Sequence, residues 1–400
     1  MRLHSLVIVM MLWIVPLAAD AGSDPFFGEN GEMRKIIEEG LQIKSHMQAE
    51  KARYLDAYES SMRRNGLSAV LGAERALGQK RNGFATGLRW SLFDGGYFGS
   101  REDARRKRLQ EEIAYNREIE GVVSAYTKIA ALEIGSIRHT IAYHYSGMKR
   151  PILKRLLRQA KRKLHSGIIT RATYRQIKAL YDKNEKALHY LKFHQGKKFD
   201  QKYRKLIEKI ETVKLLPLDR ITERAVAHAV SVENARAKLQ LADDPEGIAD
   251  HIKTTLYLDR KQYTFVDRRE TLAGVGVAIP LDTFSKSDEL RSVTKQHLKI
   301  EARSAELLLR KEIAARYDDI AWHKDLIAKY KRQIALYRGD ISQLQARDRY
   351  AIAAAYGDSQ IDTAMTKLKL LEERQHIWEE RCEILIDLIR LQYLSGIKIM

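Results

Sequence analysis

The stretch Gly87-Leu88-Arg89-Trp90-Ser91-Leu92 recurs in outline as Gly276-Val277-Ala278-Ile279-Pro280-Leu281. Each stretch is followed by a further glycine, Gly167 in the first case and Gly357 in the second. The two stretches end 189 positions apart (281 − 92), and the two glycines are 190 positions apart (357 − 167). Landmarks that recur with nearly the same separation indicate an internal duplication. We therefore predict a first repeat over residues 22–210 and a second over residues 211–400.

Both stretches alternate in the way that β-strands do. Bulky side chains occupy every second position, which puts them on one face of a strand. This face comprises Phe84, Leu88, Trp90 and Leu92 in the first repeat and Val275, Val277, Ile279 and Leu281 in the second. Strand pairs are predicted at about 66–92 and 252–281. A half-buried strand of a soluble sheet would also alternate, but an apolar face with aromatic ends suits a lipid-facing strand of a transmembrane barrel.

Helical periodicity follows each strand pair. Over residues 288–355, apolar residues step by three and four with one polar exception, which predicts a coiled-coil seam. The seam comprises Leu309, Ile313, Tyr317, Ile320, Lys324, Ile327, Tyr330, Ile334, Tyr337, Ile341 and Leu344. A similar pattern over residues 99–165 predicts a helix on the order of 100 Å long. The pattern resumes after Gly167 and Gly357, so each glycine is predicted at the bend of a long helical hairpin. A further helix is predicted at 31–63.

The first 21 residues have the features of a cleaved signal peptide. Arg2 precedes an apolar run from Leu6 to Leu17, and Ala19-Asp20-Ala21 fits a cleavage site. No later segment is apolar over enough residues to span a bilayer as a helix, so a mature chain in a membrane would need a barrel. The net charge of +19 would ordinarily suggest nucleic acid, but an exported chain meets anionic lipid first. We expect no nucleic-acid partner.

No pattern of catalytic or metal-binding residues stands out. The 12 histidines are scattered, there is no phosphate-binding glycine loop, and the single cysteine, Cys382, lies on an apolar helical stripe. We interpret Cys382 as a buried small hydrophobe and expect no enzymatic activity, no cofactor and no metal. The basic, polar segment from Lys197 to Lys209 is expected to link the repeats without forming a core.

The two strand ends and the two glycine bends together resemble the TolC-like outer membrane efflux protein family. The run Leu88 to Gly96 is similar to the strand end and Leu-Phe-Asp-Gly-Gly turn of that family, and Pro280-Leu281 stands in its Pro-Leu position. The resemblance implies a mainly helical homotrimer with a 12-stranded transmembrane β-barrel, four strands per protomer, that continues into a long periplasmic coiled-coil barrel. It also implies a passive export duct of a tripartite efflux or type I secretion system, in the outer membrane of a Gram-negative bacterium.

The resemblance further implies partners and sites. The partners would be a periplasmic membrane-fusion adaptor, an inner-membrane pump or ABC exporter, and outer-membrane lipid. The adaptor-docking tips would be Ser166, Gly167 and Ile168 in the first hairpin and Tyr356, Gly357 and Asp358 in the second. Where well-known members carry constricting aspartates, this chain has threonines, so the aperture candidates are Thr173, Asp362, Thr363 and Thr366.

A basic run before the first bend is the sharpest local signal. Eight cations fall within residues 149–163 without an acid, and we single out Arg155, Arg158, Lys161 and Arg162 as a basic tip face. Three interpretations stay open: a solvated helix face, a docking site for an acidic adaptor surface, or a lumen lining that favours anionic solutes. The competing function for the whole chain is a periplasmic coiled-coil adaptor or scaffold without a barrel.

Overall fold

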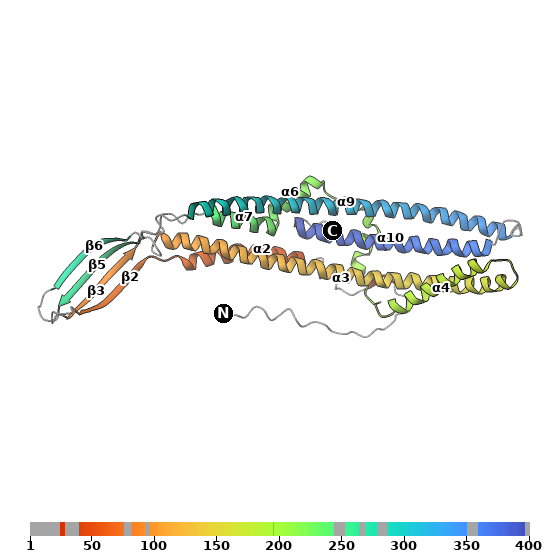
Figure 1. Cartoon of the computed structure of the whole chain (residues 1–400), viewed down its shortest axis with the longest axis horizontal. Coiled ribbons are helices and arrows are strands. Elements are labelled where there is room, and N and C mark those ends of the chain that lie inside the picture. The colour runs from red at the N-terminus through yellow and green to blue at the C-terminus, as the bar shows by residue number, and fades with distance from the viewer. Residues whose placement is uncertain are drawn as a thin grey trace.

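The computed structural model describes residues 25–28, 40–75, 82–92, 97–194, 196–243, 253–263, 269–278, 287–349 and 359–396. Several sequence-based expectations lie outside these ranges: the signal peptide, Ile279 and Leu281, and the second tip at Tyr356, Gly357 and Asp358. The molecule is elongated, with a four-stranded sheet at one end and long helices that run from it to the other end (Figure 1).

Helices, strands and long hairpins follow one another twice in a similar order. The first half contains β1 (Phe27–Gly28), α2 (Gly40–Met62), β2 (Leu67–Arg75), β3 (Asn82–Ser91), α3 (Gly99–His165) and α4 (Arg171–Leu191). A middle segment contains β4 (Phe199–Asp200), η2 (Gln201–Tyr203), α5 (Arg204–Glu208), η3 (Ile210–Thr212), α6 (Leu218–His228) and α7 (Val230–Asp243). The second half contains β5 (Lys253–Tyr263), β6 (Arg269–Ala278), α9 (Ser287–Arg349) and α10 (Ser359–Ser395).

The sheet joins the two halves of the chain. Its order is β2-β3-β5-β6, and every neighbouring pair is antiparallel. The central pairing places Leu88 of β3 opposite Leu258 of β5. The strands contain 9 to 11 residues. One chain therefore forms an open sheet with β2 and β6 at its edges, and not a closed barrel.

The coiled-coil seam predicted on α9 is confirmed. Leu309, Ile313, Ile320, Ile327 and Ile334 are buried, and the other members of the seam are half-buried. α9 packs along α10, which in turn packs against α3. The polar exception Lys324 has a structural explanation, since its Nζ donates a hydrogen bond to the carbonyl oxygen of Val213 at 2.6 Å. The amine thus ties the middle segment to the seam.

A second, smaller core lies toward the hairpin tips. It contains side chains from both hairpins: Leu153, Leu156 and Ala160 of α3, Ile177 of α4, and Ile361 and Leu368 of α10. α4 also carries a pronounced apolar face toward α3, which explains why it folds back along that helix. The two hairpins are therefore packed together near their free ends.

The expectation that residues 197–209 form no core is wrong. Phe199, Tyr203 and Ile207 are buried, as is Ile210 just beyond, in the main core against α10. The ring of Phe199 packs near that of Phe27, with centroids 5.7 Å apart. The four buried side chains are spaced four, four and three residues apart, over a short strand, two 3-10 turns and a five-residue helix. The surrounding lysines and arginines hid that short apolar pattern from the sequence analysis.

Candidate functional site: strand face and hairpin tip

The register of the sheet brings apolar side chains of all four strands onto one face. Directly opposite residues in an antiparallel pair project to the same side. One cross-strand row is Leu67, Trp90, Leu256 and Val275, and the next is Ala69, Leu88, Leu258 and Ala273. Leu88 is 51% exposed and Val275 is 62% exposed. Such a row of large exposed apolar groups marks a surface that contacts lipid or another apolar partner.

This apolar face has an aromatic border and a mixed border. At the helix end, the Trp90 ring lies near Tyr97, with centroids 6.3 Å apart, and its Nε1 donates to the Asn65 carbonyl oxygen at 2.9 Å. Aromatic rings with one polar atom are typical of membrane–water interfaces. At the other end, the row of Leu71, Thr86, Arg260 and Thr271 is mixed, with three polar residues beside the exposed Leu71. Phe84 lies one row beyond it, opposite Gln262.

The opposite face of the sheet is mainly polar. It carries Ser68, Arg89 and Asp259, with Tyr257 between them, and its apolar exceptions are the half-buried Val70 and the exposed Leu272. Arg89 Nη2 lies 3.6 Å from Asp259 Oδ2, so the two charges form an ion pair across β3 and β5. A sheet with one apolar and one polar exposed face is what the wall of a water-filled barrel requires.

The tip of the first hairpin is defined by its backbone. Gly167 has φ +71, and its N–H donates to the Leu164 carbonyl, while the Ile168 N–H donates to the Lys163 carbonyl. These two bonds form a Schellman motif, which ends α3. Thr170 then caps α4, since its Oγ1 accepts a hydrogen bond from the Thr173 N–H at 3.2 Å. The residues of the bend thus specify a tight turn.

Replacement of Gly167 by Ala is expected to destabilise the hairpin by about 1 kcal/mol, because an L residue at positive φ is strained. Gly147→Ala is the control, because its expected effect on stability has the opposite sign. Gly147 lies inside α3, and a Cβ added there would meet no atom within 4 Å, so Gly147→Ala should stabilise the helix by about 0.5–1 kcal/mol. Chemical denaturation of the two variants would show both shifts. Equal effects of the two substitutions would contradict the assigned role of the bend.

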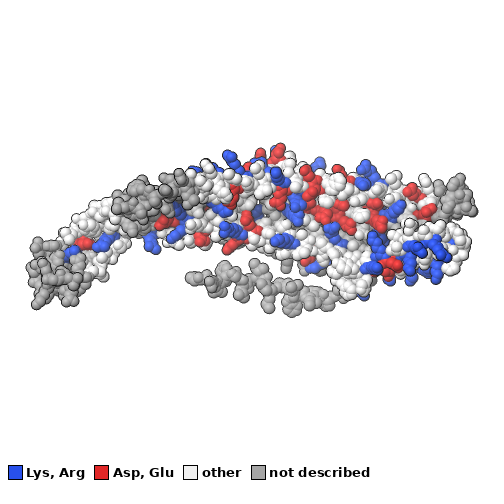
Figure 2. Space-filling view, in the orientation of Figure 1, with Lys and Arg blue, Asp and Glu red and all other residues white. Residues whose placement is uncertain are grey.

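The basic tip face is exposed. Arg155, Arg158, Lys161 and Arg162 all lie on the outside of α3, and none has an acidic partner in the described part of the chain. Two other cations of the run are engaged: Arg150 pairs with Glu185 at 2.8 Å, and Lys149 contacts Glu372 and Gln375. The sequence from Ile134 to Tyr181 contains no aspartate or glutamate. Figure 2 shows the resulting gathering of lysine and arginine at the α3–α4 end.

The aperture candidates differ in their surroundings. Thr363 is buried, and its Oγ1 has no hydrogen-bond partner within the described ranges. Thr366 donates its hydroxyl to the Asp362 carbonyl at 2.8 Å, while the Thr173 hydroxyl lies 3.0 Å from that of Thr170. Asp362 is exposed in the first turn of α10. Asp362 is therefore the candidate whose charge is available to solvent, and its role at an aperture stays a prediction.

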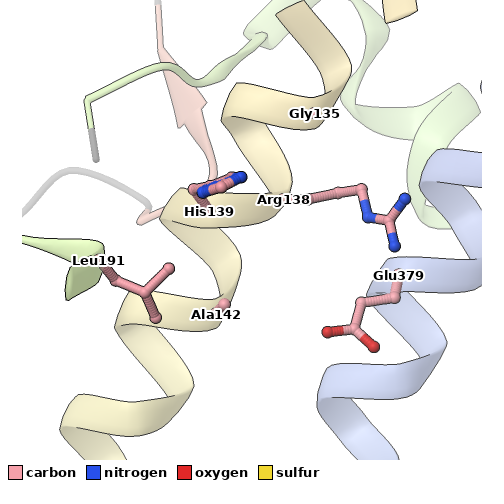
Figure 3. A pocket seen from close by; sticks show the side chains of 6 residues that line it. All are labelled: Gly135, Arg138, His139, Ala142, Leu191 and Glu379. Carbon is pink, nitrogen blue, oxygen red and sulfur yellow. The ribbon is translucent and has the colours of Figure 1, made fainter. Parts of the chain in front are cut away.

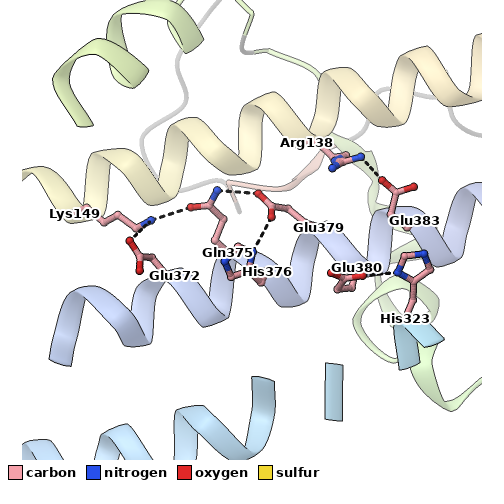
Figure 4. Close-up of polar contacts among 9 residues, drawn as sticks. All are labelled: Arg138, Lys149, His323, Glu372, Gln375, His376, Glu379, Glu380 and Glu383. Atoms are coloured by element: carbon pink, nitrogen blue, oxygen red, sulfur yellow. Dashed lines mark hydrogen bonds and ion pairs between the residues drawn. The ribbon is translucent and has the colours of Figure 1, made fainter. Parts of the chain in front are cut away.

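A polar network holds α10 against its two neighbours (Figure 4). Arg138 and Lys149 of α3 pair with Glu383 and Glu372 of α10, and His323 of α9 contacts Glu380. His376 contacts Glu379 at 3.0 Å, and this hydrogen bond raises the pKa of His376 above its usual value. The long helices thus carry interhelical charge pairs as well as an apolar seam. Sequence analysis missed these pairs because the partners are more than 50 residues apart.

A shallow pocket of about 260 Å³ lies between α3, the end of α4 and α10 (Figure 3). Its lining comprises Gly135, Arg138, His139, Ala142, Leu191 and Glu379. Burial, with His194 and Arg138 nearby, lowers the pKa of His139, so this imidazole is neutral at neutral pH. Within the described ranges, no three histidine, cysteine or acidic side chains lie together as a metal site would need. Cys382 is fully buried, as predicted.

Among the helices that the structure describes, none combines the length and apolar character that a membrane span needs. No family model matches the sequence, and no curated protein matches it. Solved structures do match. The outer membrane protein VceC of Vibrio cholerae superposes with a TM-score of 0.60 at 12% identity, and the match covers 92% of this chain and 97% of that chain.

Two further solved structures match this chain over most of its length. A membrane protein from Pseudomonas aeruginosa has a TM-score of 0.55 at 12% identity, over 95% of this chain and 97% of its own. CusC, whose structures concern transmembrane channel formation, has a TM-score of 0.51 at 12% identity, over 95% and 96%. The chain has the fold of the TolC-like outer membrane channels. The four-stranded sheet and the first hairpin tip lie at opposite ends of the molecule.

Proposed function

We propose that the protein is an outer-membrane duct, built from several copies of this chain, through which solutes leave the periplasm passively. The observation that carries this proposal is the register of the sheet, which aligns the apolar residues of four strands on one exposed face. Lipid is the partner that such a face fits, because the strands have the length of transmembrane β-strands. The outer-membrane channel fold supports the same reading. The fold includes the sheet, which disfavours a scaffold without a barrel.

The open sheet edges argue for an oligomer. In lipid, the unpaired N–H and C=O groups of β2 and β6 would each cost several kcal/mol. Single-chain bacterial barrels begin at eight strands, so four strands need further copies. Three copies would supply 3 × 4 = 12 strands.

The long helices also have unpartnered apolar stripes. On α9, exposed apolar residues recur at multiples of seven along two lines, about 100° apart around the helix and both on the side away from the seam. One line contains Val293, Ile300 and Leu307, and the other contains Leu308, Trp322 and Leu336. A helix with two apolar stripes packs against partners on both sides. We propose that neighbouring copies cover this second stripe and that the helices close a periplasmic tunnel. An inner-membrane pump or ABC exporter would supply the energy.

A cysteine scan along β3 tests the placement of the sheet. The native Cys382 is fully buried and burial raises the pKa of its thiol, so the wild-type chain provides an unreactive background. In outer membranes, Ala85→Cys and Ser91→Cys on the polar face should react with a membrane-impermeant thiol reagent. Leu88→Cys, in the centre of the apolar face, should stay protected. Equal reactivity on the two faces would mean that the sheet is not in lipid.

The basic tip face is proposed to dock an acidic surface of a periplasmic adaptor. Replacement of Arg155, Arg158 and Arg162 by Gln should weaken adaptor capture, and the loss should shrink as salt rises, because exposed charges are screened beyond about 8 Å at physiological salt. The matched control replaces three exposed cations of α3 that lie far from the tip, Lys107, Arg117 and Lys128, by Gln. Unchanged capture by the tip variant, or an equal loss in the control, would remove this docking site.

A further inference from the structure

Two side chains of β5 lie flat across glycines of the neighbouring strands on the polar face. A Cβ at Gly87 of β3 would overlap Asp259 Oδ1, and a Cβ at Gly274 of β6 would overlap the Tyr257 ring. The glycines therefore leave space that these side chains fill. Such glycines permit close approach within a strand, at a cost in backbone entropy. On this face, the side chains of Asp259 and Tyr257 therefore lie along the sheet and do not project from it.

The two charges of the Arg89–Asp259 pair are unequally exposed. The Asp259 side chain is 13% exposed, and the Arg89 side chain is 47% exposed. One carboxylate oxygen of Asp259, Oδ1, is buried over Gly87 without a hydrogen-bond partner among the described residues. The guanidinium lies 3.6 Å from the other oxygen and extends from the sheet. The anion is thus held in the wall, while the cation meets the solvent.

We infer that Arg89 sets the local charge of the duct wall and favours anionic over cationic solutes at this level. The inference rests on the proposed duct, in which the polar face lines the lumen. Three copies would place three guanidinium groups around the bore, and charged rings of this kind set selectivity in pores. The negative charge of Asp259 weakens the positive potential of Arg89 but does not cancel it, because the Asp259 side chain is less exposed to the lumen than the Arg89 side chain.

A cysteine introduced opposite Arg89 reports the local electrostatic potential through its rates of reaction with charged reagents. Ser68 pairs with Arg89 in the register and is exposed, so Ser68→Cys places one thiol beside the guanidinium. The probes are an anionic and a cationic methanethiosulfonate reagent applied to outer membranes. The readout is the ratio of the anionic rate to the cationic rate. At low salt, addition of Arg89→Gln should lower this ratio roughly two- to five-fold, and addition of Asp259→Asn should raise it.

The outcomes separate the inference from the function. If Ser68→Cys reacts while Leu88→Cys is protected, and the two charge variants shift the ratio in opposite directions, the inference stands. If the two cysteines differ in reactivity but neither charge variant changes the rate ratio, Arg89 does not set the local charge. The proposed duct function would still stand in that case. If both cysteines react equally, the sheet is not a membrane wall, and the proposed function and the inference both fail.

Discussion

Replacement of Leu88 by Arg is expected to prevent stable insertion of the protein into the outer membrane. Leu88 is exposed at the centre of the apolar face, between Ala69 and Leu258 in the register. An arginine on the lipid face near the bilayer midplane costs about 2–4 kcal/mol. A trimer carries the substitution three times, so the penalty is about 6–12 kcal/mol, which is comparable to the whole stability of a typical domain. The measurement is the amount of oligomer in the outer-membrane fraction.

Thr255→Arg is the matched control for this variant. Thr255 lies on the polar face, opposite Ser91 and Gly276, so the same charge would point into water. Its oligomer should accumulate at nearly the wild-type level. Normal assembly of Leu88→Arg, or equal loss in both variants, would show that the two faces do not differ in environment.

Replacement of Glu211 by Gln is expected to destabilise the helical part by about 3 kcal/mol, because it leaves the Arg381 charge half-compensated in a poorly solvated site. Both side chains are nearly buried, at 12% and 11% exposure, and Arg381 Nη2 lies 3.3 Å from Glu211 Oε1. Lys331 also contacts this carboxylate, at 2.6 Å. Chemical denaturation in detergent measures the loss. The exposed Glu312→Gln on α9 is the control and should change stability by less than about 0.5 kcal/mol.

The effect of Glu211→Gln should depend on pH. Burial alone would raise the pKa of Glu211, but hydrogen bonds from Lys331 and Arg381 outweigh it and hold this pKa below its usual value. A carboxyl with a lowered pKa stabilises the fold fully above its unfolded pKa of about 4.3, and this contribution is lost as the pH falls through the folded value. The wild type and the variant should therefore differ in stability at neutral pH and converge as the pH falls through the lowered pKa of Glu211 in the folded state. A constant difference would contradict the ion-pair assignment.

The strand faces and the helical seam could be predicted because each follows from a local period. Alternation placed Leu88 and Trp90 on one face, and steps of three and four placed Ile313, Ile320 and Ile327 in the seam. Gly167 could be located for a similar reason, since a glycine between two helical patterns is a common helix end. These signals require only neighbours in sequence, so the sequence of this one chain was sufficient.

The features that the sequence did not reveal depend on distant contacts. Lys324 interrupts the apolar seam, and the contact that explains it, a hydrogen bond to the Val213 carbonyl oxygen, joins residues that are far apart in sequence. The burial of Phe199 and Ile207 depends on α10, which lies more than 150 residues away in sequence. The Asp259 carboxylate over Gly87 needed the register between β3 and β5, which joins the two halves of the chain. The burial of Thr363 was not visible from spacing alone, and its role at an aperture stays a prediction.

Assembly of several copies of this chain into a duct in the outer membrane can be measured directly. Electrophoresis of the outer-membrane fraction with and without heating is combined with the mass of the detergent-solubilised protein. We expect a band that migrates as an oligomer before heating and as a monomer afterwards, and a solubilised mass of three protomers. A monomer in the soluble periplasmic fraction would contradict this expectation.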